Sequence, residues 1–153
     1  MKKLFLSLAV VLTTAMGWAQ DSQIYKAQEQ LEEGKFKEAQ ATMAEVLANP
    51  KTKKLAYAYN VAGQAELRLL NEQIDKYSSK QPLDTVVFVN SLDNAVKYLL
   101  KSYEIDNTPD AKGHVKPKFN TGEKFTIGEG NGNVTWLTKI MGYYLIAAQF
   151  EYT

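Results

Sequence analysis

Apolar residues recur three or four positions apart in five stretches of the chain, over residues 22–33, 37–48, 53–70, 91–105 and 137–152. In the first four stretches they alternate with Gln, Lys, Glu and Asn. This spacing places the apolar side chains on one face of a helix, which is the pattern of an amphipathic helix packed on a core. The pattern therefore predicts an all-α protein.

The ends of the first helices carry stop signals. Gly34 follows the first stretch, in the position where a glycine commonly ends a helix. Pro50 stops the second helix, because the residue before a proline is biased away from helical geometry. The third stretch contains the small residues Ala62, Gly63 and Ala65 along its apolar stripe. We expect these small residues to let a neighbouring helix approach closely.

Two predicted connections, residues 71–90 and 107–135, are unusually long. Structureless loops of this length are uncommon in compact domains. In the first, Val86-Val87-Phe88-Val89 fits a short buried strand or an additional helical turn, and both interpretations stay open. In the second, Asn131-Gly132 is a two-residue hairpin signal. Apolar residues flank it on both sides and predict a small β-hairpin: Phe125, Ile127, Val134 and Trp136.

Part of the second predicted helix is echoed in the fourth. Gly34-Lys35-Phe36-Lys37-Glu38-Ala39, with Met43, Val46 and Pro50, recurs loosely as Leu92-Asp93-Asn94-Ala95, with Leu99, Ser102 and Asp106. The pattern resembles the tetratricopeptide repeat (TPR), a helical hairpin of about 34 residues. Matches to the first helix of that repeat are Tyr59, Ala62 and Gly63, and then Tyr143, Ile146, Ala147 and Phe150. Departures are the early Pro50, Asn107 where proline is usual, and Glu66.

Equivalent positions fit this resemblance when two inserts are allowed. Ala39 and Ala95 are 56 residues apart, and the excess over one period falls in residues 71–90. Ala95 and Ala147 are 52 residues apart, and that excess falls in residues 107–135. The resemblance implies one domain over residues 20–153, a helical-hairpin solenoid of about two and a half repeats. Exported bacterial TPR proteins with long inserts are the most similar group.

The resemblance also implies a binding surface. In the TPR family one face of each first helix lines a concave groove that takes peptides. Here that face carries Tyr57, Asn60, Gln64 and Arg68. Tyr57 would stack on the ligand, Asn60 and Gln64 would hydrogen-bond its backbone, and Arg68 would pair with a carboxylate. The alternative is an ordinary solvated helix face.

The last predicted helix is the first half of a third repeat, and its apolar residues include Phe150 and Tyr152. Helical-repeat arrays need a terminal unit with a polar outer face. Two interpretations follow: the chain is a truncated piece of a larger array that another subunit completes, or this face docks on another molecule. In the second case we expect self-association through Phe150 and Tyr152.

The first residues predict export. Lys2-Lys3, an apolar run from Leu4 to Met16, and small residues at Gly17 and Ala19 match a secretory signal peptide over residues 1–19, cleaved before Gln20. The run is shorter than the roughly 20 residues that span a bilayer. We therefore expect a periplasmic or secreted protein with no membrane insertion after cleavage. The chain has no cysteine, so its stability cannot come from disulfides.

Charge and residue chemistry favour binding over catalysis. Without residues 1–19 the chain has 16 Lys and Arg against 17 Asp and Glu, which gives no electrostatic reason to expect a nucleic acid. We interpret the cluster of Lys51, Lys53 and Lys54 as a solvated turn. His114 is the single histidine, and the glycines at 128–132 lack the Gly-Lys-Ser/Thr ending of a phosphate loop. The sequence thus predicts a protein-interaction module without cofactor, metal or enzymatic activity, whose partner is a protein or peptide.

Overall fold

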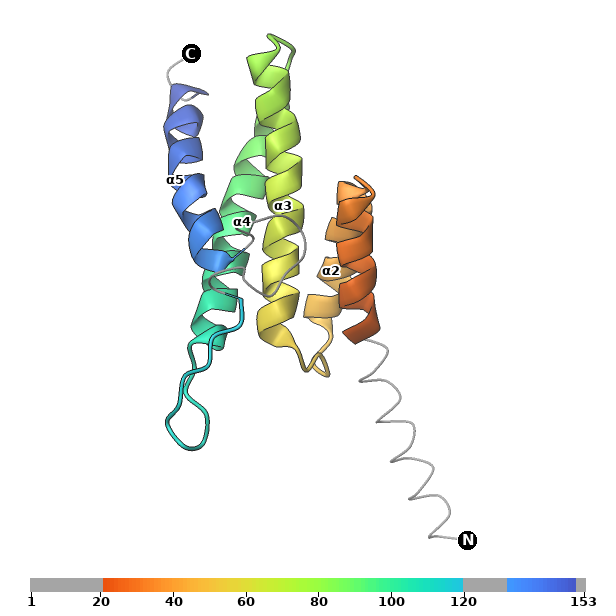
Figure 1. Ribbon diagram of the computed structural model, residues 1–153. Helices are drawn as coiled ribbons and strands as arrows, with labels where there is room; N and C mark the ends of the chain where they lie inside the picture. The colour runs from red at the N-terminus through yellow and green to blue at the C-terminus, as the bar shows by residue number, and fades with distance from the viewer. Residues whose placement is uncertain (1–20, 120–131, 151–153) are drawn as a thin grey trace, which may run out of the picture.

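The computed structural model describes residues 21–119 and 132–150, and every regular element in these ranges is an α-helix (Figure 1). A first helix covers residues 21–32. It is followed by four longer helices: α2 (Phe36–Ala48), α3 (Leu55–Ser78), α4 (Thr85–Asp106) and α5 (Asn133–Phe150). The all-α prediction is confirmed.

Consecutive helices run in alternating directions and lie next to their neighbours in the chain (Figure 1). α3 packs against α2 and α4, and α5 packs against α4. None of the described helices is both long enough and apolar enough to cross a membrane.

Gly34 ends the first helix as predicted. Its φ of 77° lies in the left-handed region, which a glycine adopts without steric cost. The amide of Gly34 donates to the carbonyl of Leu31 at 3.3 Å, and the amide of Lys35 donates to the carbonyl of Gln30 at 2.8 Å. This pair of bonds is the Schellman motif, which turns the chain directly into α2.

The insert at residues 71–90 extends two helices, which corrects the prediction of a long loop. α3 continues to Ser78 and α4 begins at Thr85, so the helical pair reaches well beyond α2 (Figure 1). The Asp84 carboxylate caps α4 by accepting from the amide of Val87 at 3.0 Å. Phe88 is fully buried between the helices. The open choice for residues 86–89 is therefore decided in favour of helix.

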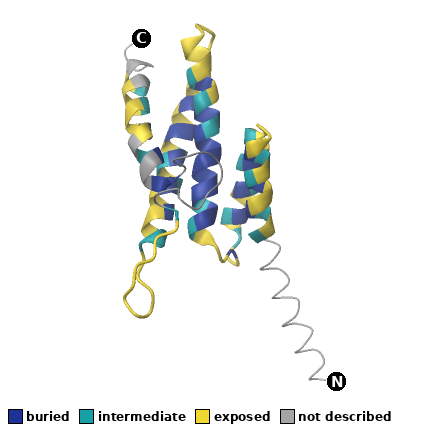
Figure 2. Cartoon of the chain, in the orientation of Figure 1, coloured by how far each residue is buried: buried dark blue, intermediate teal, exposed yellow. Residues whose placement is uncertain are grey.

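Two apolar clusters hold the helices together (Figure 2). The first joins the helix of residues 21–32, α2 and the beginning of α3. The second joins the later part of α3 to α4 and α5, with Leu67, Leu92 and Ile140 at its centre. Between α3 and α4, an added Cβ at Gly63 would lie 2.6 Å from Cγ of Leu99. The predicted close approach at Gly63 is confirmed.

The predicted β-hairpin is wrong in the part that the structure describes. Val134 and Trp136 lie in the first turns of α5 instead of a strand. Trp136 is 8% exposed and packs with Ile140 in the second apolar cluster. Residues four positions apart lie on the same face of a helix, so Trp136 and Ile140 can both pack against α3 and α4 only when this segment is helical. Phe125, Ile127 and Asn131 lie outside the described residues.

Candidate functional site

A pocket of about 840 Å³ lies where the helix of residues 21–32, the start of α3, the end of α4 and the loop before α5 meet. We call it the basic pocket. Its lining combines three aromatic rings with three lysines: Tyr25, Tyr57, Phe119, Lys53, Lys54 and Lys118. These residues come from segments far apart in the sequence, so the pocket exists only in the folded chain.

The aromatic wall of the basic pocket is built around Tyr57. Its ring stacks on Phe119 with centroids 5.5 Å apart and planes 7° apart. The Tyr25 ring lies on it at 5.6 Å in a tilted arrangement. The Tyr57 hydroxyl donates to the side-chain oxygen of Gln28, and burial raises the pKa of this phenol. The three rings form an apolar surface suited to an aromatic or aliphatic group.

Asp106 positions the loop side of the pocket. Its carboxylate accepts the backbone amides of Lys118, at 2.8 and 2.9 Å, and of Phe119, at 2.7 Å. The carbonyl of Phe119 in turn accepts the amide of Asn133, the first residue of α5, at 2.8 Å. The long connection is therefore tied to the end of α4 and to the start of α5. This holds the Phe119 ring against Tyr57.

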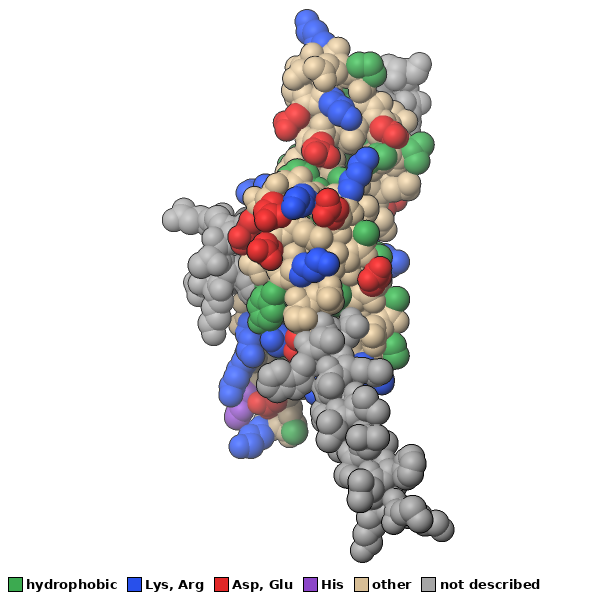
Figure 3. Space-filling model, turned by 90° about the vertical axis from the view of Figure 1, so that its right-hand side faces the viewer, with side chains coloured by type: hydrophobic (Ala, Val, Ile, Leu, Met, Phe, Trp, Pro, Cys, Tyr) green, Lys and Arg blue, Asp and Glu red, His purple; other side chains and the backbone are tan. Residues whose placement is uncertain are grey.

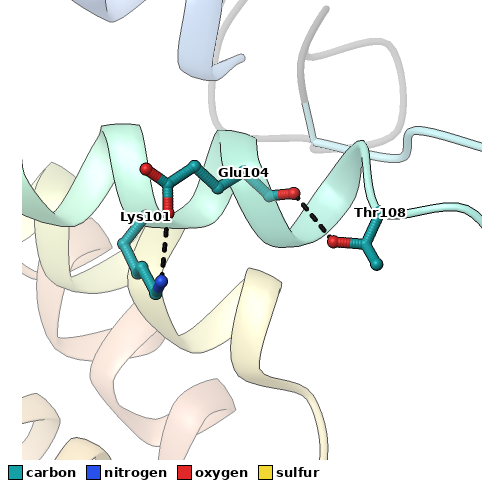
Figure 4. Close-up of polar contacts among 3 residues, drawn as sticks. All are labelled: Lys101, Glu104 and Thr108. Carbon is teal, nitrogen blue, oxygen red and sulfur yellow. Dashed lines mark hydrogen bonds and ion pairs between the residues drawn. The ribbon is translucent and has the colours of Figure 1, made fainter.

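Two polar contacts stabilise the end of α4, where the loop begins (Figure 4). The Thr108 hydroxyl donates to the carbonyl of Glu104 at 3.0 Å, and Lys101 pairs with the Glu104 carboxylate at 3.0 Å. The hydroxyl satisfies one of the carbonyls that a helix terminus leaves without an amide partner. The lysines of the loop gather near its histidine on the face shown in Figure 3.

Two of the three lysines of the basic pocket lack a paired carboxylate within the described residues, so the pocket carries a positive charge. Within the described residues, neither Lys53 nor Lys118 has a carboxylate within ion-pair distance. Lys54 lies 3.1 Å from the hydroxyl of Tyr25 and 3.7 Å from the carboxylate of Asp21. The hydrogen bond with Tyr25 is the main cause that raises the pKa of Lys54, and the Asp21 carboxylate makes a smaller contribution in the same direction. None of the described lining residues is acidic.

The four residues of the predicted groove do not share one open surface. Asn60 and Gln64 are buried, Arg68 is half-buried, and Tyr57 is buried but lines the basic pocket. This differs from the accessible face that the resemblance implies. Their role in binding a peptide stays a prediction.

Asn60 and Gln64 belong to a buried chain of polar contacts. The Gln64 amide donates to Oδ1 of Asn60 at 2.7 Å, and the Asn60 amide donates to Oδ1 of Asn133 at 2.8 Å. The Asn133 amide donates to the hydroxyl of Ser102 at 2.9 Å, which donates to the carbonyl of Ala56 at 2.7 Å. The chain joins α3, α4 and α5. Because every contact is internal, its direct effect is to fix the start of α5.

The sequence contained part of the signal for the basic pocket. The lysine cluster at residues 51–54 has the pattern of a solvated turn, whereas Lys53 and Lys54 line the pocket. The sequence alone does not join Lys118 and Phe119 to this cluster, because Lys118 lies 64 residues after Lys54 and the position of both residues depends on Asp106.

Comparison with known protein families, with curated proteins and with solved structures found no match. Among the described residues, no group of three or more His, Cys, Asp or Glu side chains is placed to hold a metal ion.

Proposed function

We propose that this protein is a non-catalytic interaction module of the cell envelope, with a TPR-like arrangement, that binds an acidic segment of a peptide or protein in the basic pocket. The observation that carries this proposal is that Lys53 and Lys118, which have no ionic partner among the described residues, lie beside a stacked aromatic wall. The predicted signal peptide supports the location. The sequence resemblance and the neighbour-to-neighbour packing of the helices support the repeat arrangement.

The mechanism of binding is passive. Carboxylates of the ligand would pair with the Lys53 and Lys118 ammonium groups, and an apolar side chain would cover the ring of Phe119. Both lysines are exposed, so each pair contributes about 0.2–1 kcal/mol and is weakened by salt. Most of the affinity must therefore come from the aromatic contact, and the charges provide selection for acidic ligands.

Fluorescence polarisation with short labelled peptides tests this proposal. One peptide carries Glu and Phe, and a matched peptide carries Lys and Phe. We expect the acidic peptide to bind more tightly and to lose affinity as salt is raised. The double variant Lys53→Glu/Lys118→Glu should weaken it at least about tenfold, because two attractions become repulsions.

A charge-matched control keeps that experiment specific. Lys37→Glu/Lys76→Glu makes the same change in net charge, and both residues lie at the opposite end of the helices from the basic pocket (Figure 1). We expect this control to bind like the unmodified protein. Equal weakening by both double variants would show a general charge effect and reject the basic pocket.

One observation favours a second candidate function, a structural piece of a larger helical assembly that another subunit completes. On the outer side of α5, Met141 is 72% exposed and Leu145 is 73% exposed. The side chain of Phe150 and all of Tyr152 lie outside the described residues, so self-association through them stays a prediction. Light scattering on the purified protein distinguishes the candidates. An oligomer that Met141→Glu/Leu145→Glu converts to monomer supports the structural role.

A further inference from the structure

A second, smaller pocket of about 270 Å³ lies between α2, α3 and α4. It shares no lining residue with the basic pocket. Its walls combine apolar groups, among them Met43, Leu47 and the ring of Tyr98, with a comparable share of polar ones. Its acidic lining residue is Glu66, which is only 3% exposed. We call this cavity the Glu66 pocket.

Glu66 is held by neutral groups. The Gln40 amide nitrogen donates to both carboxylate oxygens, at 2.9 and 3.0 Å, and the side chains of Ser91 and Asn94 also hydrogen-bond to the carboxylate. In the described parts of the chain, no lysine or arginine lies within ion-pair distance of it. Hydrogen bonds satisfy the oxygens but leave the negative charge without a counter-charge. Buried charges are normally paired.

From this geometry we infer that the Glu66 pocket is a binding site for a primary ammonium group on an alkyl stem. The carboxylate would supply the counter-charge, and Gln40 and Asn94, whose amide oxygens can act as further acceptors, line the same cavity. An ammonium has three donors, which these acceptors match. Met43 and Leu47 would contact the stem, and the face of Tyr98 would add a favourable cation–π contact.

The position of the Gln40 amide leads us to expect that the site binds an ammonium in preference to a guanidinium. An arginine binds a carboxylate best through two parallel bonds to both oxygens. In this structure the Gln40 amide nitrogen already bridges the two Glu66 oxygens. A compact ammonium can approach from the cavity without using that edge. The site should therefore prefer a lysine side chain, or a small alkylamine, over arginine.

NMR titration of the isotope-labelled protein tests the site, with butylammonium as the probe and butanol as its neutral counterpart. We expect saturable shifts at Gln40, Asn94 and Tyr98 and a Kd at least about tenfold lower for butylammonium, because the charge contact is absent in butanol. Lysine and arginine derivatives with blocked termini form the other arms. Binding of the lysine derivative assigns the site to a protein lysine. Binding of butylammonium with exclusion of that derivative assigns it to a small amine.

Two variants complete the test. Glu66→Gln removes the charge at constant shape and should abolish the butylammonium shifts. Glu45→Gln makes the same charge change on the exposed side of α2 and should leave them intact. Should Glu66→Gln not fold, the Glu66 carboxyl carbon resonance of the unmodified protein decides, because butylammonium but not butanol must move the titration of this carboxyl to lower pH. The inference is overturned if butanol binds as tightly as butylammonium, or if the arginine derivative binds as tightly as the lysine derivative. It is also overturned if Glu66→Gln binds butylammonium like the unmodified protein, or if no saturable shifts are seen.

Discussion

The contact between Gly63 and Leu99 makes a quantitative prediction about how α3 and α4 pack. A Cβ at Gly63 would lie 2.6 Å from Cγ and 2.8 Å from Cδ2 of Leu99. Leu99 is fully buried, so it has no free space to move into. Forcing an extra methyl into a packed core costs about 1–3 kcal/mol. Replacing glycine by alanine inside a helix gains about 1 kcal/mol. We therefore expect Gly63→Ala to lower the free energy of unfolding by about 1 kcal/mol.

Gly142 in α5 provides the matched control. A Cβ at this position would meet nothing within 4 Å, and the residue is exposed. Gly142→Ala should therefore show the helix-propensity gain alone, an increase of about 1 kcal/mol in the free energy of unfolding. The difference between the two variants isolates the collision with Leu99. Urea denaturation followed by circular dichroism measures both values under the same conditions.

A double-mutant cycle identifies the partner of the collision. Leu99→Ala alone should cost about 2–5 kcal/mol, because it leaves a cavity. In the Gly63→Ala background the new methyl occupies part of that cavity, so the same change should cost at least about 1 kcal/mol less. Additive effects, or a Gly63→Ala variant as stable as Gly142→Ala, would refute the reasoning that Gly63 is required for close packing.

Three further predictions concern polar residues. Asn133→Ala should cost about 1–3 kcal/mol in urea denaturation, because the buried amide of Asn60 loses its acceptor; an unchanged midpoint would contradict the network. Burial raises the pKa of Glu66 above its ordinary 4.5, so the folded state holds this proton more tightly. Relative to Glu66→Gln, the protein should lose stability as pH rises above 4.5 through the raised pKa, and parallel melting curves across that range would disprove it. Asp106→Ala should release the amides of Lys118 and Phe119 and speed tryptic cleavage of the loop about tenfold, whereas unchanged cleavage would show that Asp106 does not hold it.

Most of the helical fold followed from sequence because hydrophobic periodicity and helix stop signals are local. Gly34 is an example, since its stop signal depends only on its own turn. The apolar pattern does not predict the extension of α3 and α4, for the opposite reason. Residues 71–78 are mostly polar, and Ile74 is the one aliphatic side chain among them that packs against the core, so the apolar stripe fades although the helix continues. Asp84 then starts α4 earlier than the apolar pattern suggests.

The errors near α5 have a related cause. Asn131-Gly132 is a strong local signal for a hairpin, but Val134 and Trp136 after it lie in α5, where Trp136 is buried against two other helices. Asn60 illustrates the same limit at the predicted groove. Its spacing from Tyr57 places it on a polar helix face, and the distant residues Ser102 and Asn133, with the helices that carry them, make that face internal. Sequence spacing predicts which residues share a face of one helix, whereas a binding site depends on which other helices and loops cover that face.

The two pockets differ in a way that relates burial to specificity. The lysines of the basic pocket are exposed, so salt screens their attraction for an acidic partner. Glu66 is almost fully buried, so its attraction for a cation is screened much less, but its cavity admits only a small group. An acidic segment would therefore associate quickly and weakly at the basic pocket, whereas a lysine at Glu66 would bind slowly and selectively. A partner could carry both an acidic segment and a lysine, spaced to reach from the basic pocket at the start of α3 to the Glu66 pocket near its middle. Such a partner would gain affinity because its two binding groups are linked, without any additional contact.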